Sequence, residues 1–330
     1  MEKRTLKELL VVASMLFGMF FGAGNLIFPA SMGQMAGWNL WQASAGFLIT
    51  GVGLPLLGVA ALGISREDGL LGLSSRVGKR YGLFFTCVLY LTIGPFFAIP
   101  RCATVSYTVG IERVLPGAGQ TVGLAVFSCS FSAWCCSFRS GRGNPDVDRE
   151  GAEPAVPLLP GNPGGARIGF PLGNFAEIAP SGAYASHAFS TGLLEGYNTM
   201  DALAGLAFGI VVVEAIRGLG VKEPGQVAKR TVYAGIFSSL LMALIYVLVT
   251  VVGAQSRGLF DVASNGGEAL AQIAEHYFGG AGAFILAATI TVACLKTAVG
   301  LVTSCGETFV RTYWGGRLPG AGSGAPSYPS

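Results

Sequence analysis

The sequence predicts an all-α polytopic membrane protein, and its composition and its long apolar segments lead to this fold class. Of its 330 residues, 52% are hydrophobic and only 12% are charged, whereas roughly a quarter of an average soluble domain is charged. Several apolar segments reach the roughly 20 residues that a helix needs to cross a bilayer. They lack the alternation of polar and apolar residues over about 10 residues that is typical of a membrane β-strand.

About seven spanning helices are expected, in two groups. The expected spans are residues 9–30, 41–64, 81–110, 121–138, 196–216, 231–253 and 279–310. Residues 1–138 would form a membrane domain of four helices, and residues 173–314 one of three. Gly, Pro and charged residues fill positions 139–172, and the tail at 315–330 is rich in Gly, Pro and Ser, so both are predicted to be disordered.

The distribution of basic residues places the loops, but one crossing is missing. Lys3, Arg4 and Lys7 make the N-terminus basic, and the loops at 65–80 and 217–230 are basic as well, so all three are expected in the cytoplasm. Four spans return the chain to the cytoplasm at 139, yet a single span then precedes the loop at 217–230. Either one segment is misassigned or a crossing is absent.

The tract at 139–172 does not look like the absent crossing. It carries five prolines between positions 145 and 163, and each proline inside a helix costs roughly 3 kcal/mol. We therefore hypothesise that a span normally encoded here has been lost, for instance by a shift of reading frame that starts near Cys129 and ends before Gly173.

The first span contains a predicted break at residues 21–29. Gly22, Ala23, Gly24 and Asn25 are followed by Pro29, and such residues at mid-depth indicate an interrupted helix. Interrupted helices persist in a bilayer where their freed backbone groups face protein, water or a bound solute. The interruption offers N–H groups for a carboxylate and carbonyl groups for a cation. The alternative is a face of small residues that packs against another helix.

Five motifs in the same order resemble those of the bacterial branched-chain amino acid carriers, the leucine, isoleucine and valine cation symporters. The motifs lie at residues 17–29, 91–106, 180–184, 194–203 and 293–301. The resemblance covers roughly residues 5–127 and 173–310. It implies a LeuT-type bundle, like that of the amino acid/polyamine/organocation carriers, with helices one and six broken. Compared with a twelve-helix carrier, this chain is expected to be truncated, without helix five and everything beyond helix eight.

The resemblance also implies the residues of the site. Substrate would be bound by Gly22, Ala23, Gly24 and Asn25 of the first helix and by Gly196, Tyr197 and Asn198 of the sixth. A sodium site would use the carbonyl groups of Gly18 and Phe21 with Asn25, Ala293, Lys296 and Thr297.

Three charged residues keep alternative roles open. Glu195 and Asp201 could belong to the site or could cap the entry of a helix, where acids favour the N-terminal dipole. Arg101 follows Pro100 and could gate the site or extend to the lipid headgroups, and the second role is favoured.

Lys296 is unusual because LeuT-type sodium sites carry adjacent hydroxyl residues, whereas here an amine precedes Thr297. Its ammonium group either replaces the cation, with proton coupling, or extends away and leaves sodium coupling intact.

The expected function is import of leucine, isoleucine and valine, coupled to sodium or protons by alternating access, across the inner membrane of a bacterium with the N-terminus in the cytoplasm. The alternative is a non-transporting truncated product or a subunit of a larger assembly. No enzyme is expected, because no nucleophile with a base and no phosphate-binding loop occurs. The expected partners are the substrate, sodium or a proton, and the lipid bilayer; neither nucleic acid nor a cofactor beyond a possible sodium ion is expected.

Overall fold

A computed structural model describes residues 3–22, 24–65, 67, 69–114, 120–140, 175–221 and 223–314. Helices and short connections make up this part of the chain, and no β-strand occurs within it, which confirms the all-α class. Most of the predicted disordered tract and the whole of the predicted tail lie outside the described residues.

The described residues of the first half of the chain form eight helices and three short 3-10 or π segments. They are α1 (Lys3–Phe20), α2 (Gly24–Ala36), η1 (Gly37–Asn39), α3 (Leu40–Leu48), η2 (Ile49–Gly53), α4 (Leu54–Ser65), α5 (Leu70–Ser75), α6 (Lys79–Leu91), η3 (Thr92–Phe96), α7 (Ala98–Val114) and α8 (Gln120–Ser140). The π segments η2 and η3 continue α3 into α4 and α6 towards α7. π segments inside helices often occur at functional sites, and η3 contains Pro95, which cannot donate a helical hydrogen bond.

The second half contains the longest helices. They are η5 (Phe175–Glu177), α11 (Tyr184–Asn198), α12 (Asp201–Gly218), α13 (Pro224–Ser256), α14 (Gly266–Phe278) and α15 (Gly280–Trp314). Pro224 is the first residue of α13, a position where a proline costs nothing because that N–H has no helical partner.

The number of helices that could each span a membrane alone differs from the sequence prediction of about seven. Within the described residues, four stretches are long and apolar enough: 24–65, 79–110, 224–256 and 280–310. A fifth is the pair Tyr184–Gly209 and Val211–Gly218, bent by 44°. The break in the first predicted span explains part of the difference, because α1 is separated from α2 and begins with charged residues. The chain is still polytopic.

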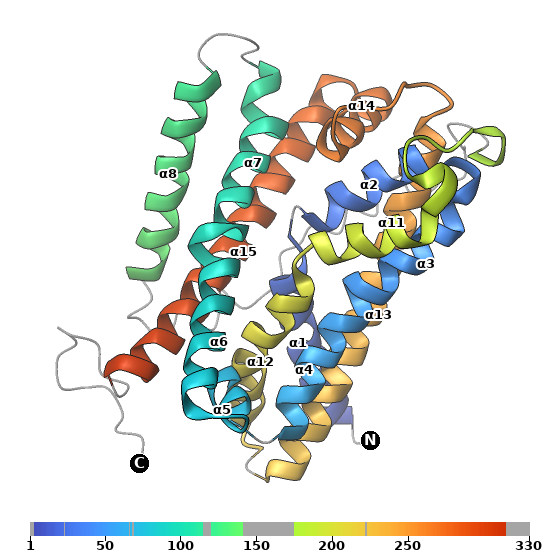
Figure 1. Cartoon of the computed structure of the whole chain (residues 1–330). Helices are drawn as coiled ribbons and strands as arrows, with labels where there is room; N and C mark the ends of the chain where they lie inside the picture. The colour runs from blue at the N-terminus through green and yellow to red at the C-terminus, as the bar shows by residue number, and fades with distance from the viewer. Residues whose placement is uncertain are drawn as a thin grey trace.

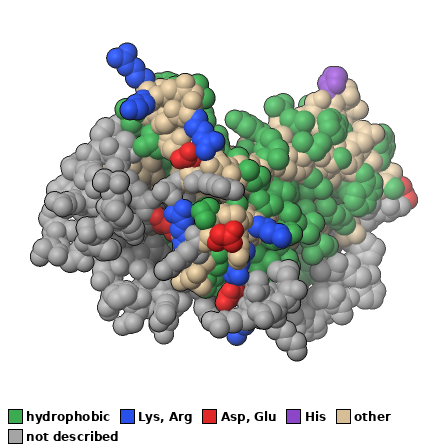
Figure 2. Space-filling view, turned by 90° about the horizontal axis from the view of Figure 1, so that it is seen from below, with side chains coloured by type: hydrophobic (Ala, Val, Ile, Leu, Met, Phe, Trp, Pro, Cys, Tyr) green, Lys and Arg blue, Asp and Glu red, His purple; other side chains and the backbone are tan. Residues whose placement is uncertain are grey.

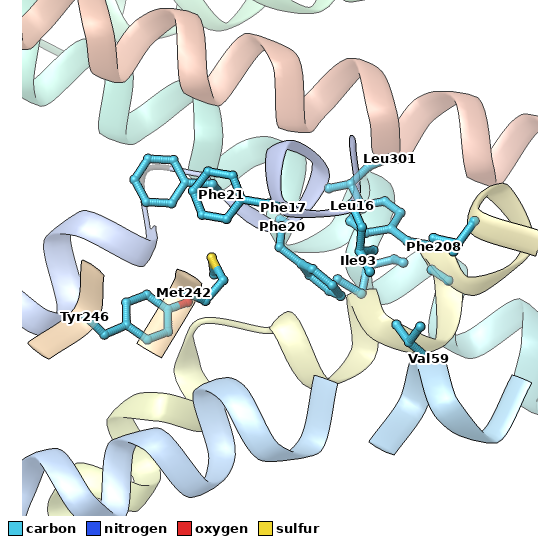
Figure 3. Packing of buried hydrophobic residues seen from close by; sticks show 14 of the residues in the cluster. Leu16, Phe17, Phe20, Phe21, Val59, Ile93, Phe208, Met242, Tyr246 and Leu301 are labelled. Atoms are coloured by element: carbon cyan, nitrogen blue, oxygen red, sulfur yellow. The ribbon is translucent and has the colours of Figure 1, made fainter. Parts of the chain in front are cut away.

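Two bundles of helices surround the first break (Figure 1). On one side α13 packs against α1, α2 and α4, while α11 packs on α3 and α12 on α4. On the other side α15 packs against α7 and α8. The core between them includes Leu16, Phe20, Ile93 and Phe208, and Figure 3 shows their side chains gathered around α1.

Glycines allow α2 to pack closely on α13, and α11 to pack closely on α3. A Cβ atom at Gly33 would lie 2.1 Å from the carbonyl oxygen of Thr250 in α13. At Gly46 a Cβ atom would lie 2.1 Å from the carbonyl oxygen of Phe189 in α11. Small residues are commonly used in this way between membrane helices, so the two helices that flank the breaks are held by backbone contact.

The three basic regions lie at one end of the molecule. The start of α1, the segment around α5 and the turn from α12 to α13 are all at the lower end in Figure 1. Figure 2 shows this end, where lysine and arginine side chains occur beside a broad hydrophobic flank. Arg230 forms an ion pair with Glu8 at 3.0 Å, which joins α13 to α1. This common location agrees with the expectation that the three regions share one side of the membrane.

The opposite end shows where a crossing is needed. The end of α7, the start of α8, η5 and the start of α11 all lie there (Figure 1). The chain therefore leaves this end along α8 and is back at it by η5. The residues between α8 and η5 lie outside the described residues, so the loss of a crossing inferred from the charges stays a prediction.

Candidate functional site

The break in the first helix is stabilised mainly by its own residues. Helix α1 ends at Phe20 and α2 begins at Gly24. The N–H of Gly22 donates to Oδ1 of Asn25 at 3.0 Å, and the N–H of Asn25 donates to the carbonyl oxygen of Gly22 at 3.2 Å. In a continuous helix the Gly22 N–H would bond to the carbonyl of Gly18. The carbonyl of Gly18 is therefore released from its helical donor.

A second break, formed by Thr199 and Met200, separates α11 from α12. These two helices correspond to the expected sixth helix of the family, and they are called the sixth helix below. Among the described residues Met200 is the single non-glycine with a positive φ, 65°, a left-handed conformation that side chains disfavour. Backbone strain of this kind costs about 1–3 kcal/mol and is common at binding sites. Thr199 lies between the two halves of the helix, because its hydroxyl donates to the Gly196 carbonyl at 2.8 Å and accepts from the Asp201 N–H at 3.4 Å.

Arg101 of α7 satisfies the carbonyl groups that this break releases. Its two terminal nitrogens donate to the carbonyl oxygens of Asn198 at 2.5 Å and Thr199 at 2.9 Å. The guanidinium carbon lies 5.5 Å from the centre of the Phe28 ring in α2, which is within cation–π range. The guanidinium group therefore joins the two broken helices, and the extension of Arg101 to the headgroups stays a prediction.

Three buried polar side chains meet between the breaks. Asn25, Asp201 and Tyr246 are 3%, 4% and 1% exposed. The amide of Asn25 donates to Oδ2 of Asp201 at 2.6 Å and also to the Tyr246 hydroxyl. The Tyr246 hydroxyl donates to the same Oδ2 at 2.7 Å. One carboxylate thus joins three helices, α2, α12 and α13.

A cavity of about 40 Å³ lies beside this cluster. Polar and apolar groups line it together. The glycines and polar residues are Gly22, Gly24, Asn25, Arg101, Thr199, Asp201 and Thr297, and the apolar residues are Met19, Phe20, Ile93, Ala98, Cys102, Val105, Met200, Ala204, Phe208 and Leu301. One water centre needs ~10–15 Å³, so the cavity has room for a few waters. A convergence of charged and apolar groups in one cavity is typical of a small-molecule site.

The structure brings together some of the residues predicted to bind substrate. Gly22, Gly24 and Asn25 line the cavity, whereas Ala23 lies outside the described residues. Of the predicted residues in the sixth helix, Tyr197 and Asn198 are exposed and neither lines the cavity. Gly196 is a packing residue, because a Cβ atom there would lie 2.4 Å from the carbonyl oxygen of Phe47. The sixth helix instead reaches the cavity with the next three residues, 199–201.

Of the three predicted cation ligands in α15, Thr297 lies closest to the first break. A Cβ atom at Gly22 would be 2.9 Å from its hydroxyl oxygen, and this buried hydroxyl has no hydrogen-bond partner among the described residues. Gly18 and Phe21 are buried in the same region. Ala293 and Lys296 are half-buried and do not line the cavity, so the Lys296 ammonium group is not part of the polar wall.

Sequence reasoning missed Tyr246 and left Asp201 open between cap and site. Tyr246 lies in an apolar run of α13, and a tyrosine in such a run usually finds a partner for its hydroxyl. That signal does not name the partner, because Asn25 and Asp201 are 221 and 45 residues away along the chain.

The helices and this cavity define a polytopic helical membrane protein with a partly polar cavity between two interrupted helices. Comparison with known proteins identifies the family. Residues 5–314 match the family described as branched-chain amino acid transport protein, and the chain belongs to this family.

Three relatives show how similar the chain is to other members of the family and how much of each protein the match covers. The chain is 54% identical to the branched-chain amino acid permease BrnQ of Lactobacillus delbrueckii subsp. lactis, over 94% of this chain and 70% of that protein. It is 40% identical to BrnQ of Bacillus subtilis, over 93% and 70%. It is also 40% identical to the branched-chain amino acid transport system 2 carrier protein of Pseudomonas aeruginosa, over 92% and 68%.

Proposed function

We propose that the protein carries branched-chain amino acids across a bacterial inner membrane, with cation coupling, by alternating access around the breaks at residues 21–23 and 199–200. The observation that carries the proposal is the cavity between these breaks, which combines charged groups with an apolar wall. The permease relatives support the choice of leucine, isoleucine and valine.

The cavity suits an aliphatic amino acid. Phe20, Ile93 and Phe208 form an apolar wall against which a branched side chain is removed from water, and burial contributes roughly 1.5–3 kcal/mol for such a side chain. The first turn of α2 and the guanidinium group of Arg101 lie close together, because a Cβ atom at Gly24 would be 3.6 Å from that group. Both present positive charge to a carboxylate.

The small size of the cavity supports a mechanism in which the helices around it separate to admit the substrate. A volume of about 40 Å³ holds a few waters rather than a whole leucine, so the substrate enters only when the helices around the cavity separate. The two breaks are suitable hinges, since the half-helices on either side of each can move about the interruption. Rocking of one group of helices against another is the usual form of alternating access.

In this proposal the coupling cation binds beside Gly22 and Thr297. Sodium prefers oxygen ligands, and two are available here: the unpartnered hydroxyl of Thr297 and the carbonyl of Gly18, which has lost its helical donor. Lys296 neither lines the cavity nor pairs with an acid among the described residues. This arrangement favours sodium coupling with the Lys296 ammonium directed elsewhere.

Uptake into vesicles tests the proposal. Proteoliposomes that contain only the full chain are expected to accumulate labelled leucine when a sodium gradient is imposed. Thr297→Ala is expected to raise the sodium concentration for half-maximal uptake by roughly tenfold, because a cation loses one ligand. Lys296→Gln, the neighbouring change, is expected to leave it within about twofold.

Two results would contradict the proposal in different ways. Absence of leucine binding and uptake would favour the non-transporting alternative. Full uptake without sodium at a fixed proton gradient, together with loss of uptake in Lys296→Gln, would show that the lysine replaces the cation.

A further inference from the structure

We infer that Asp201 binds the α-ammonium group of the substrate, an inference that rests on the proposed transport of amino acids. A carboxylate that is 4% exposed inside a membrane protein is expensive unless it has a partner. Among the described residues no basic side chain forms an ion pair with it: Arg101 is near enough to act on it electrostatically, but its terminal nitrogens donate to the Asn198 and Thr199 carbonyls. The group is therefore suited to a ligand that brings its own positive charge.

The hydrogen bonds of Asp201 leave one side of the carboxylate for this ligand. Asn25 and Tyr246 both donate to Oδ2. The Thr199 hydroxyl also lies beside the carboxylate, but it directs its hydrogen to the Gly196 carbonyl. Asp201 lines the cavity, so a primary ammonium group can approach it from there. The two donors fix the plane of the carboxylate, as buried partners commonly do for ligand-binding groups.

Asn25 and Tyr246 disfavour a metal cation at this point. The amide of Asn25 turns its NH₂ group to Asp201, while its oxygen accepts the Gly22 N–H. The Tyr246 hydroxyl also directs its hydrogen to the carboxylate. A sodium ion beside Oδ2 would meet two donors where it needs acceptors. An ammonium group differs, because it is itself a donor and needs one free carboxylate oxygen.

The charges around the cavity match a zwitterion. The positive groups, Arg101 and the first turn of α2, lie beside Gly24, and the negative group is Asp201 at the start of α12. The apolar wall completes the site. An α-amino acid presents a carboxylate, an ammonium group and a side chain, and each has a separate counterpart here.

Asp201 also lies at the first turn of α12, where an acid stabilises the helix N-terminus. If Asp201 only capped the helix, changing it would weaken the binding of every ligand by the same factor. Ammonium binding predicts a loss that depends on whether the ligand carries an ammonium group. The two roles can therefore be separated with a pair of ligands that differ only there.

The experiment compares L-leucine with (S)-2-hydroxy-4-methylpentanoate, which keeps the carboxylate and side chain but replaces the ammonium group by a hydroxyl. Equilibrium binding is measured on the purified full chain in lipid nanodiscs. The unmodified protein is expected to bind leucine at least tenfold more tightly. Asp201→Asn is expected to weaken leucine by roughly 10- to 100-fold, as for loss of a charged hydrogen bond, and the hydroxy acid by less than about threefold.

Two further variants keep the test decisive. Glu195→Gln changes a nearby half-buried acid that does not line the cavity and is expected to leave both affinities unchanged. Tyr246→Phe keeps the ring, which packs 5.1 Å from Phe47, and removes one donor to Asp201. It is expected to weaken leucine a few-fold more than the hydroxy acid, and it serves where Asp201→Asn does not fold.

Several outcomes would overturn the assignment. Equal loss of both ligands in Asp201→Asn would show a capping role. Unchanged leucine binding with loss of proton-driven accumulation would make the carboxylate a proton carrier instead. Similar affinity of the unmodified protein for both ligands would exclude ammonium recognition, whereas binding of neither would refute the proposed function as well.

Discussion

The two breaks differ in how their freed backbone groups are satisfied. At the first break, Gly22 and Asn25 bond to each other, three residues apart. At the second, the carbonyls of Asn198 and Thr199 depend on Arg101, which belongs to another helix almost 100 residues earlier. The first break is local in origin, and the second needs the folded bundle. Local breaks leave a pattern in the sequence, whereas a break completed by a distant side chain leaves little.

The largest effect is expected from filling the space at the first break. In Gly22→Ala the new methyl group would lie 2.9 Å from the Thr297 hydroxyl, and such overpacking costs about 1–3 kcal/mol. Leucine uptake is expected to fall by roughly tenfold or more, because small displacements of binding groups are costly. Thermal unfolding in detergent and uptake are measured together.

Two matched variants separate crowding from loss of a ligand. Gly300→Ala places a methyl group on α15, the helix that carries Thr297, where no atom of the described residues lies within 4 Å, and should leave uptake unchanged. Adding Thr297→Ala to Gly22→Ala should restore the unfolding temperature without restoring the response to sodium. If Gly22→Ala alone transports normally, the close approach of the two helices is not needed.

A smaller effect is expected at the second break. Arg101→Ala removes both donors to the Asn198 and Thr199 carbonyls, and uptake is expected to fall by roughly fivefold, since such hydrogen bonds are partly replaceable by water. Arg101→Lys should recover only part of this, because a single ammonium lacks the fork that reaches two carbonyls. Arg76→Ala, which changes a 59% exposed side chain paired with Glu67, is the control. Equal uptake in Arg101→Ala and Arg76→Ala would mean that the contact does not stabilise the break.

The smallest effect is expected from the residue just before the second break. Tyr197 was predicted to bind substrate, but its side chain is 49% exposed and lies away from the cavity. Tyr197→Ala is therefore expected to change leucine uptake by less than about twofold. A larger loss would show that Tyr197 contributes to substrate binding, and that the end of α11 belongs to the site.

The sequence by itself determined the all-α class, the position of the first break and the family, because apolar length, glycines and extended motifs are properties of consecutive residues. Gly22, Gly24 and Asn25 could be placed in the site for the same reason.

Only the tertiary structure decided which polar groups meet. It brought Asp201, Tyr246 and Arg101 to the cavity and moved the contribution of the sixth helix from residues 196–198 to 199–201. A left-handed Met200 and hydrogen bonds between residues 45 to 221 positions apart cause these changes. Such contacts depend on how the helices pack, and the pattern of any single helix does not reveal them.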